Sequence, residues 1–161
     1  MADQARGELT YDEASSGEPA GRLLALARDV HSHYLRHAWP LDVPAAWVPG
    51  PNAIAFIEHT LAAMSGADLS GPARLETTGL LSGAVRLFAQ TEIEQRRAGQ
   101  DTARWQRELA VYLVQIAAAG QHAHLSGALG DTASTVDAGQ HNDLFERATA
   151  RILADLLPPR P

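Results

Sequence analysis

The sequence predicts an all-α domain of about six helices, on three observations. Apolar residues recur at three- and four-residue steps along most of the chain, which places them on single helix faces. No segment alternates apolar and polar residues, and no valine- or isoleucine-rich block lies between turns, as strands require. The length of 161 residues, with 45% apolar and 20% charged residues, suits one globular domain with its own core.

Residues 1–20 are expected to form a flexible acidic leader or the remnant of a linker. They show no apolar periodicity, and acidic residues outnumber Arg6 among them. Residues 21–161 are expected to form the folded domain.

A proline-rich connector separates the first two predicted helices. The first helix begins at Gly21 and ends at Trp39-Pro40, because proline disfavours helical geometry in the residue before it. The connector covers residues 40–50, and Pro51 opens the second helix, since proline fits a first helical turn. The second helix is expected to bury a stripe formed by Ile54, Ile57, Leu61 and Met64.

The third predicted helix runs from Ser70, its candidate N-cap, to about Arg97. It has two apolar faces. One consists of Thr78, Leu81, Val85 and Phe88, and the other of Leu80, Ala84, Leu87 and Thr91. A helix that is apolar on two sides contacts protein on two sides. Gly79 and Gly83 lie between the faces, and because a helical glycine costs up to about 1 kcal/mol, we expect them to serve close packing.

Three further helices complete the expected fold. A fourth follows Asp101, with its face formed by Trp105, Leu109, Tyr112 and Ile116. A shorter helix covers residues 122–129, and residues 130–140 are expected to be loop. The last helix covers residues 142–157, with its stripe formed by Phe145, Ala148, Ile152 and Leu156.

Composition excludes several classes of function. The chain has no cysteine, which excludes disulfides, Cys-based metal sites and cysteine nucleophiles. All 13 basic residues are arginine, so mechanisms that need a lysine are excluded. The net charge of −6 argues against DNA binding by this chain alone. No apolar stretch reaches membrane-spanning length and no secretory signal is present, so we expect a cytoplasmic protein without membrane contact.

The seven histidines of the chain raise the question of a metal site. His33 and His37 are four residues apart on one helix face, but no third ligand follows at a diagnostic spacing. The favoured interpretation is a pair of partly exposed surface histidines. His122 and His124 are two residues apart, so they point in different directions on a helix. We expect no metal ion and no cofactor.

No catalytic motif accompanies the helical pattern. A GxSxG nucleophile elbow and glycine-rich phosphate loops are absent, and Glu92 and Glu94 point apart on their helix. The remaining aromatic and hydroxyl residues fit either an ordinary core or a cavity lined by apolar walls with a few polar groups. By helical spacing we expect no arginine on these faces.

The order of the segments resembles the C-terminal domain of the tetracycline-repressor (TetR) family, in its actinobacterial branch. The resemblance rests on His37-Ala38-Trp39-Pro40, on Gly50-Pro51-Asn52-Ala53 opening a helix, and on the run from Leu80 to Phe88. It continues through Tyr112-Leu113, His122–Leu125 and Phe145–Leu153, and covers about residues 21–157.

The resemblance implies a domain that dimerises and binds a small-molecule effector. Two long helices, here residues 72–98 and 142–157, would form a four-helix bundle with a second copy. The implied interface residues are Gly79, Gly83, Leu87, Ala148 and Ile152. The implied pocket residues are Tyr34, Trp39, Phe56, His59, Thr60, Thr78, Leu81, Phe88, Trp105 and Tyr112. Their character predicts a small, mostly apolar effector held by few hydrogen bonds.

Two departures from the family pattern shape the functional hypotheses. The chain has no room before Gly21 for the family's DNA-binding helix-turn-helix, so DNA contact would need a head outside it. Residues 40–50 contain no histidine, which argues against magnesium–tetracycline as the ligand. The leading hypothesis is the effector-sensing domain of a TetR-type repressor. The alternatives are a stand-alone all-α binding protein without DNA contact and a small enzyme based on His33, His37 and His59.

Overall fold

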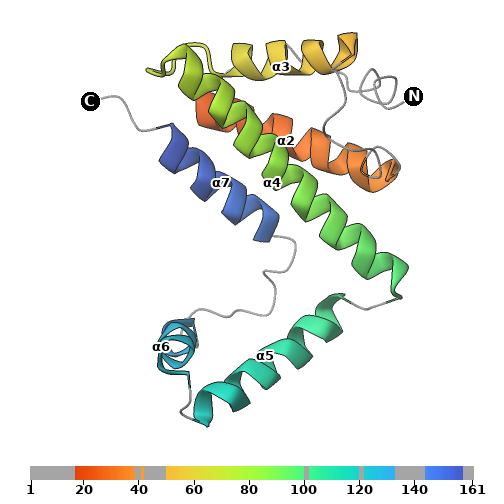
Figure 1. Cartoon of the computed structure of the whole chain (residues 1–161), viewed down its shortest axis with the longest axis vertical. Coiled ribbons are helices and arrows are strands. Elements are labelled where there is room, and N and C mark those ends of the chain that lie inside the picture. The colour runs from red at the N-terminus through yellow and green to blue at the C-terminus, as the bar shows by residue number, and fades with distance from the viewer. Residues whose placement is uncertain are drawn as a thin grey trace. The chain divides into compact units, whose positions relative to one another are not determined.

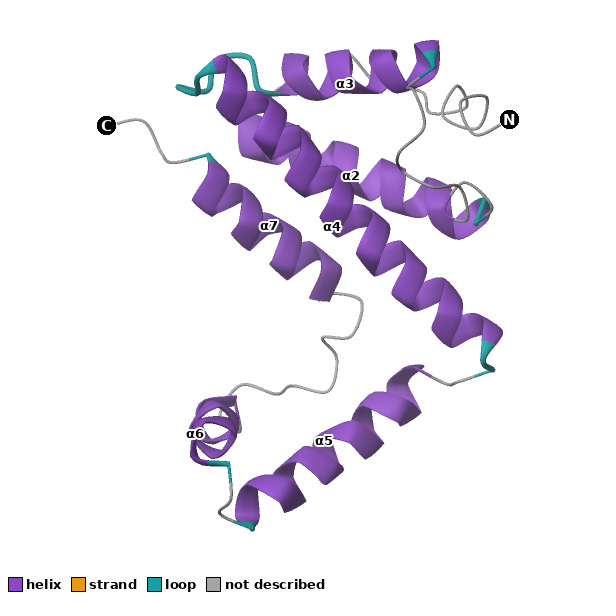
Figure 2. Cartoon of the chain, viewed as in Figure 1, coloured by secondary structure: helices purple, strands orange, loops and turns teal. Residues whose placement is uncertain are grey.

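The computed structural model describes residues 17–38, 41, 50–99, 102–119, 122–132 and 144–157. Within these ranges the chain forms six helices and no strand, which confirms the all-α prediction (Figure 1). In Figure 2 the described residues are helices and loop segments, such as the loop between α3 and α4, and no strand is drawn among them. Their bounds are α2 (Pro19–Arg36), α3 (Pro51–Ala63), α4 (Gly71–Arg97), α5 (Thr102–Ala118), α6 (Ala123–Thr132) and α7 (Leu144–Leu156).

The bounds of α2 and α6 differ from the sequence prediction, and α2 ends at Arg36 rather than at Trp39-Pro40. Helix α2 starts at Pro19 rather than Gly21, because proline is well placed in a first turn. Helix α6 continues to Thr132, so residues 130–132 are helical where a loop is predicted. The rest of that predicted loop, residues 1–16, most of the connector and Asp101 lie outside the described residues.

The chain divides into two compact units. The core unit is Met1–Ile93 with Phe145–Pro161, and the hairpin unit is Glu94–Leu144. The core unit contains α2, α3, α7 and most of α4. Its main cluster of buried residues draws on all four helices or their ends, and consists of Leu23, Ala27, Val30, Met64, Leu81, Val85 and Leu153.

Helix α4 presents one of its two apolar faces to this core. The predicted start is confirmed, since the Ser70 hydroxyl accepts a hydrogen bond from the Ala73 N–H at 3.3 Å. Thr78, Leu81 and Val85 are buried, and Phe88 is half-buried. This face is therefore an inner face, as the sequence predicts.

Helix α3 turns only part of the predicted stripe to the core, where Met64 is buried and Leu61 packs against the main cluster. Ile54 is 53% exposed, whereas Ala53 and Thr60 are buried, with Met64 just beyond the helix end. The prediction of Ile54 as a core residue is wrong. Because α3 is apolar on almost every side, its own periodicity does not single out the face that its neighbours cover.

Helix α7 shows a similar shift by one residue. Thr149 and Leu153 are its buried residues, while Ala148 and Ile152 are half-buried at the edge of that face. The buried stripe expected through Ala148 and Ile152 is therefore displaced toward Thr149.

Two arginines fasten the turn between α3 and α4. Arg22 of α2 donates from Nε to the Ala63 carbonyl at 2.9 Å and from Nη2 to the Ser65 carbonyl at 2.6 Å. Arg74 of α4 donates from Nε to the Leu69 carbonyl at 3.2 Å and from Nη2 to the Ala67 carbonyl at 3.1 Å. These bonds satisfy carbonyls that the helix end and the turn leave open.

The hairpin unit is built differently, from α5 and α6. The Ser126 hydroxyl of α6 donates to the Ala117 carbonyl of α5 at 3.0 Å. Among the residues of this unit whose burial is described, none is buried. Its half-buried apolar side chains include Leu109, Leu113, Ile116, Leu125 and Leu129.

Candidate functional site

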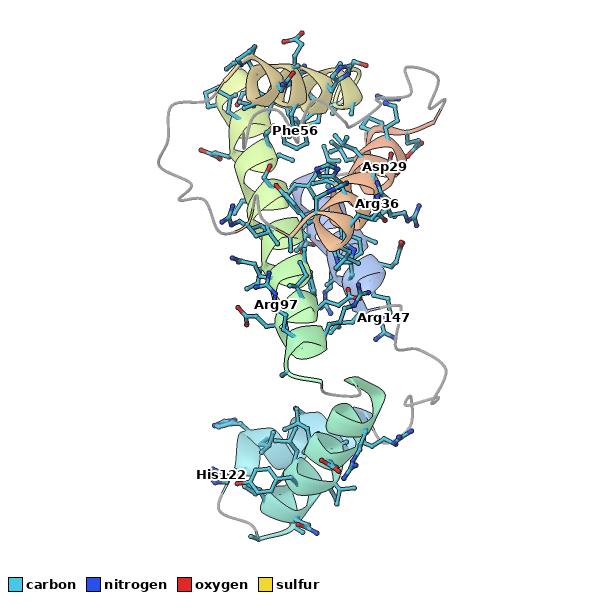
Figure 3. All side chains as sticks on the ribbon, turned by 90° about the vertical axis from the view of Figure 1, so that its right-hand side faces the viewer. Asp29, Arg36, Phe56, Arg97, His122 and Arg147 are labelled. Carbon is cyan, nitrogen blue, oxygen red and sulfur yellow. The ribbon has the colours of Figure 1, made fainter. Side chains whose placement is uncertain are left out.

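Seven of the predicted pocket residues are described in the core unit. They are Tyr34, Phe56, His59, Thr60, Thr78, Leu81 and Phe88. Leu81 belongs to the main buried cluster, and Tyr34 and Phe56 pack against that cluster. Phe56 projects from the side of α3 that faces the other helices of the unit (Figure 3). The structure therefore brings these three side chains to one region of the core.

The hydroxyl groups of this region already donate their protons. Thr60 donates to the Phe56 carbonyl at 2.8 Å, and Thr78 donates to the Arg74 carbonyl at 2.9 Å. Both threonines are buried, and their oxygens retain lone pairs that accept hydrogen bonds. These groups can therefore serve a ligand as acceptors without losing the bonds they make.

A half-buried arginine lies on the inner face of α4, contrary to the expectation from helical spacing. Arg74 is four residues before Thr78 and is half-buried. Its guanidinium is engaged with the carbonyls of Ala67 and Leu69. Among the described buried side chains there is no aspartate, glutamate or arginine, so the electrostatic character of the core is close to neutral.

Three predicted pocket residues are not placed in this region. Trp39 lies outside the described residues, and only the backbone of Trp105 is described, within α5. Tyr112 is exposed on α5 in the hairpin unit. It borders a shallow groove of about 290 Å³ whose other lining residues are Arg107, Glu108, Val111 and Gln115.

The predicted interface residues of α4 lie on its outer face. Leu80 is 56% exposed and Leu87 is 63% exposed, and Thr91 is also exposed. A Cβ atom built on Gly79 or Gly83 meets nothing within 4 Å, so these glycines do not serve close packing within the chain. The outer face therefore consists of exposed leucines beside open glycines.

The paired histidines of α2 are less exposed than expected. His33 is 2% exposed, so its interpretation as a surface histidine is wrong, while His37 is half-buried. Their ring centroids are 5.0 Å apart. His33 is buried because it falls on the inner stripe of α2 with Leu23, Ala27 and Val30. The described residues contain no group of three or more histidine, aspartate or glutamate side chains arranged to hold a metal ion.

An ion pair that periodicity does not reveal links α2 to α7. Arg28 donates from Nε and Nη2 to the two carboxylate oxygens of Glu146. The hydrogen bond from Arg28 lowers the pKa of Glu146, against a smaller opposing effect of burial. The same bond raises the pKa of Arg28. The residues are 118 positions apart, so helical spacing gives no signal for the pair.

Comparison with known protein families matches residues 14–157 to the family described as Tetracyclin repressor-like, C-terminal domain. The chain belongs to this family. A comparison with curated proteins finds no match. The match begins at residue 14, inside the segment expected to be a leader.

Membership in the TetR family confirms the coarse functional prediction. The chain is the ligand-binding and dimerisation domain of a TetR-type transcription regulator, and such domains act in regulation rather than in catalysis. In the described part of the chain, no helix has the length and apolar character needed to cross a membrane.

Proposed function

We propose that this domain senses a small, neutral, mostly apolar effector for a cytoplasmic TetR-type repressor and dimerises through the outer face of α4. The family match over residues 14–157 carries the proposal. In intact regulators of this type a helix-turn-helix binds the operator, so we propose that DNA contact is made outside these 161 residues.

The composition of the core supports a neutral effector. The described buried residues are apolar side chains, threonines and His33. A charged ligand placed among them would lose its hydration without gaining an ionic partner, at a cost of several kcal/mol. Arg74 does not change this balance, because its guanidinium already serves the turn between α3 and α4.

The threonines support an effector that carries a hydrogen-bond donor. Thr60 and Thr78 use their protons on their own helix, which leaves their oxygens as acceptors. A ligand with one or two hydroxyl or N–H groups on an apolar body would satisfy them. An acceptor-only ligand would have to displace one of the existing bonds.

The outer face of α4 supports dimerisation. Leu80 and Leu87 follow one another at the spacing of two helix turns and are more than half exposed. A second copy that presents the same face would bury both leucines in an isologous interface. Gly79 and Gly83 leave room for a neighbouring helix, and Ala148 and Ile152 are proposed to border the same contact.

A thermal-shift screen with two variants of Thr78 tests the effector proposal. The panel pairs neutral apolar alcohols and amides with carboxylic acids of similar size. We expect the best binders among the neutral donors. Thr78→Phe should abolish the ligand-induced shift and cost about 1–3 kcal/mol by overpacking.

Thr78→Val is the matched control, because it removes only the hydroxyl group. We expect it to retain binding with about tenfold lower affinity, the value of one hydrogen bond. The proposal is contradicted if carboxylic acids bind best, or if Thr78→Phe leaves the shift of the best neutral ligand unchanged.

A further inference from the structure

Three helices that are distant in sequence meet at the side chain of His31. Its ring, on α2, stacks on the ring of Phe145 of α7, with centroids 4.3 Å apart and planes 16° apart. Its Nε2 atom lies 3.5 Å from Oε2 of Glu92 on α4. Phe145 in turn meets Phe88 of α4 edge-on, with centroids 5.6 Å apart. One imidazole of α2 therefore touches both α4 and α7.

The charged groups around His31 come from all three helices. Glu92 faces it from α4, and Glu146 of α7 is close enough for a charge on His31 to contribute to the lowered pKa of that carboxylate. On its own helix, Arg28 is bonded to Glu146 and Asp29 lies beside Arg28 in sequence. The carboxylate of Glu92 is therefore a direct charged neighbour of the imidazole.

We propose that His31 is a proton-controlled clamp, which fastens α2 to α4 and α7 when its imidazole is protonated. The neutral ring makes the contact with Phe145 but has no charge to offer Glu92. The imidazolium adds attraction to Glu92 and a cation–π contribution on Phe145. The His31 side chain is only 12% exposed, so this attraction is less screened than at the surface.

The direction of the pH effect follows from linkage. The clamp requires the folded chain to hold the proton on His31 more tightly than the unfolded chain does. Its contribution is then complete below about pH 6.5, the ordinary titration point of histidine, and is lost as the pH rises. Histidine is the side chain whose charge changes in this physiological range.

Thermal unfolding of Glu92→Gln tests the clamp, because this variant keeps the shape of the side chain and removes its charge. We expect it to lower the melting temperature by about 2–4 °C at about pH 5.8 and by less than about 1 °C at about pH 7.8. Glu76→Gln is the matched control, since Glu76 is an exposed carboxylate on the same helix. It should have the same small effect at both pH values.

A second variant and a distance measurement separate a clamp from general stabilisation. His31→Gln should remove the same pH-dependent part of the melting temperature as Glu92→Gln. Because the chain has no cysteine, spin labels on Ser32→Cys and Ala150→Cys report only the distance between α2 and α7. Labelled protein is diluted with unlabelled protein so that only pairs within one chain are measured.

The distance distribution should broaden between pH 5.8 and 7.8 in the otherwise unchanged chain, and should be pH-independent with Glu92→Gln. The proposal is overturned by a distribution that does not change with pH, or by a pH response that survives both substitutions.

Discussion

The two faces of α4 carry similar apolar residues in opposite surroundings. On the inner face Leu81 is 3% exposed, and on the outer face Leu80 is 56% exposed although the two leucines are neighbours in sequence. Burying a leucine side chain contributes about 1.5–3 kcal/mol. Leu81 on the inner face gains this free energy when its own chain folds, whereas Leu80 on the outer face does not. The difference separates residues that stabilise the fold from residues available to a second protein surface.

Truncating one leucine on each face should change the free energy of unfolding by very different amounts. Leu81→Ala is expected to lower the free energy of unfolding by about 2–5 kcal/mol, because it leaves a cavity in a buried cluster. Leu80→Ala, the matched control, should cost less than about 0.5 kcal/mol at protein concentrations where the chain is monomeric. Urea denaturation measures both. Equal losses for the two variants at low concentration would show that the faces are not distinct.

A large substitution on the outer face should act on assembly rather than on the fold. Gly83→Arg is expected to weaken dimerisation at least about 100-fold, or about 2.7 kcal/mol, because a charged side chain would occupy the space for the second helix. Light scattering over a concentration series measures this effect. The folded monomer should tolerate the change, since a Cβ on Gly83 meets nothing within 4 Å.

Gly127→Arg provides the control for that experiment. Gly127 lies in α6 with equally open space around it, but outside the proposed interface. The Gly127→Arg substitution should leave the dissociation constant of the dimer unchanged. A parent chain that is monomeric at micromolar concentration would contradict the assignment of the outer face.

The smallest effect is expected at the ion pair that links α2 to α7. Arg28 and Glu146 are both partly exposed, so Arg28→Gln should cost only about 0.2–1 kcal/mol at neutral pH. The lowered pKa of Glu146 determines how the stability gained from the ion pair depends on pH. This stability is present above the ordinary glutamate pKa and is lost as the pH falls through the lowered value. Urea denaturation at about pH 7 and about pH 3 checks this. Arg151→Gln, which removes an exposed arginine from α7, the helix of Glu146, should show no such pH dependence.

Much of the fold could be predicted because local chemistry specifies it. Ser70 before Gly71-Pro72 begins α4 at the expected place, and the apolar spacing of α4 identifies both of its faces. The buried sides of α3 and α7 could not be predicted in the same way. Ile54 and Ile152 are good core residues by composition, but neighbouring helices decide which side of a broadly apolar helix is covered.

The candidate site could likewise be predicted only in part from the sequence. Thr60 and Thr78 stand out in sequence as hydroxyl groups on apolar faces, and the structure places both in the core unit. The cluster at His31 could not be found, because Glu92 and Phe145 belong to other helices and share no periodic relation with it. The position of Arg74 on the inner face could have been predicted from the sequence, since it lies one helix turn before Thr78.

The all-arginine composition has a mechanical consequence at the turn between α3 and α4. Arg22 and Arg74 each hold two carbonyl groups with one rigid guanidinium, which the single ammonium of a lysine cannot match in geometry. Arg22 joins α2 to the end of α3 and the turn after it, and Arg74 joins α4 to the same turn. A tilt of α3 relative to α2 would have to break both hydrogen bonds of Arg22 at once. These two helices are therefore expected to move together at this corner of the domain.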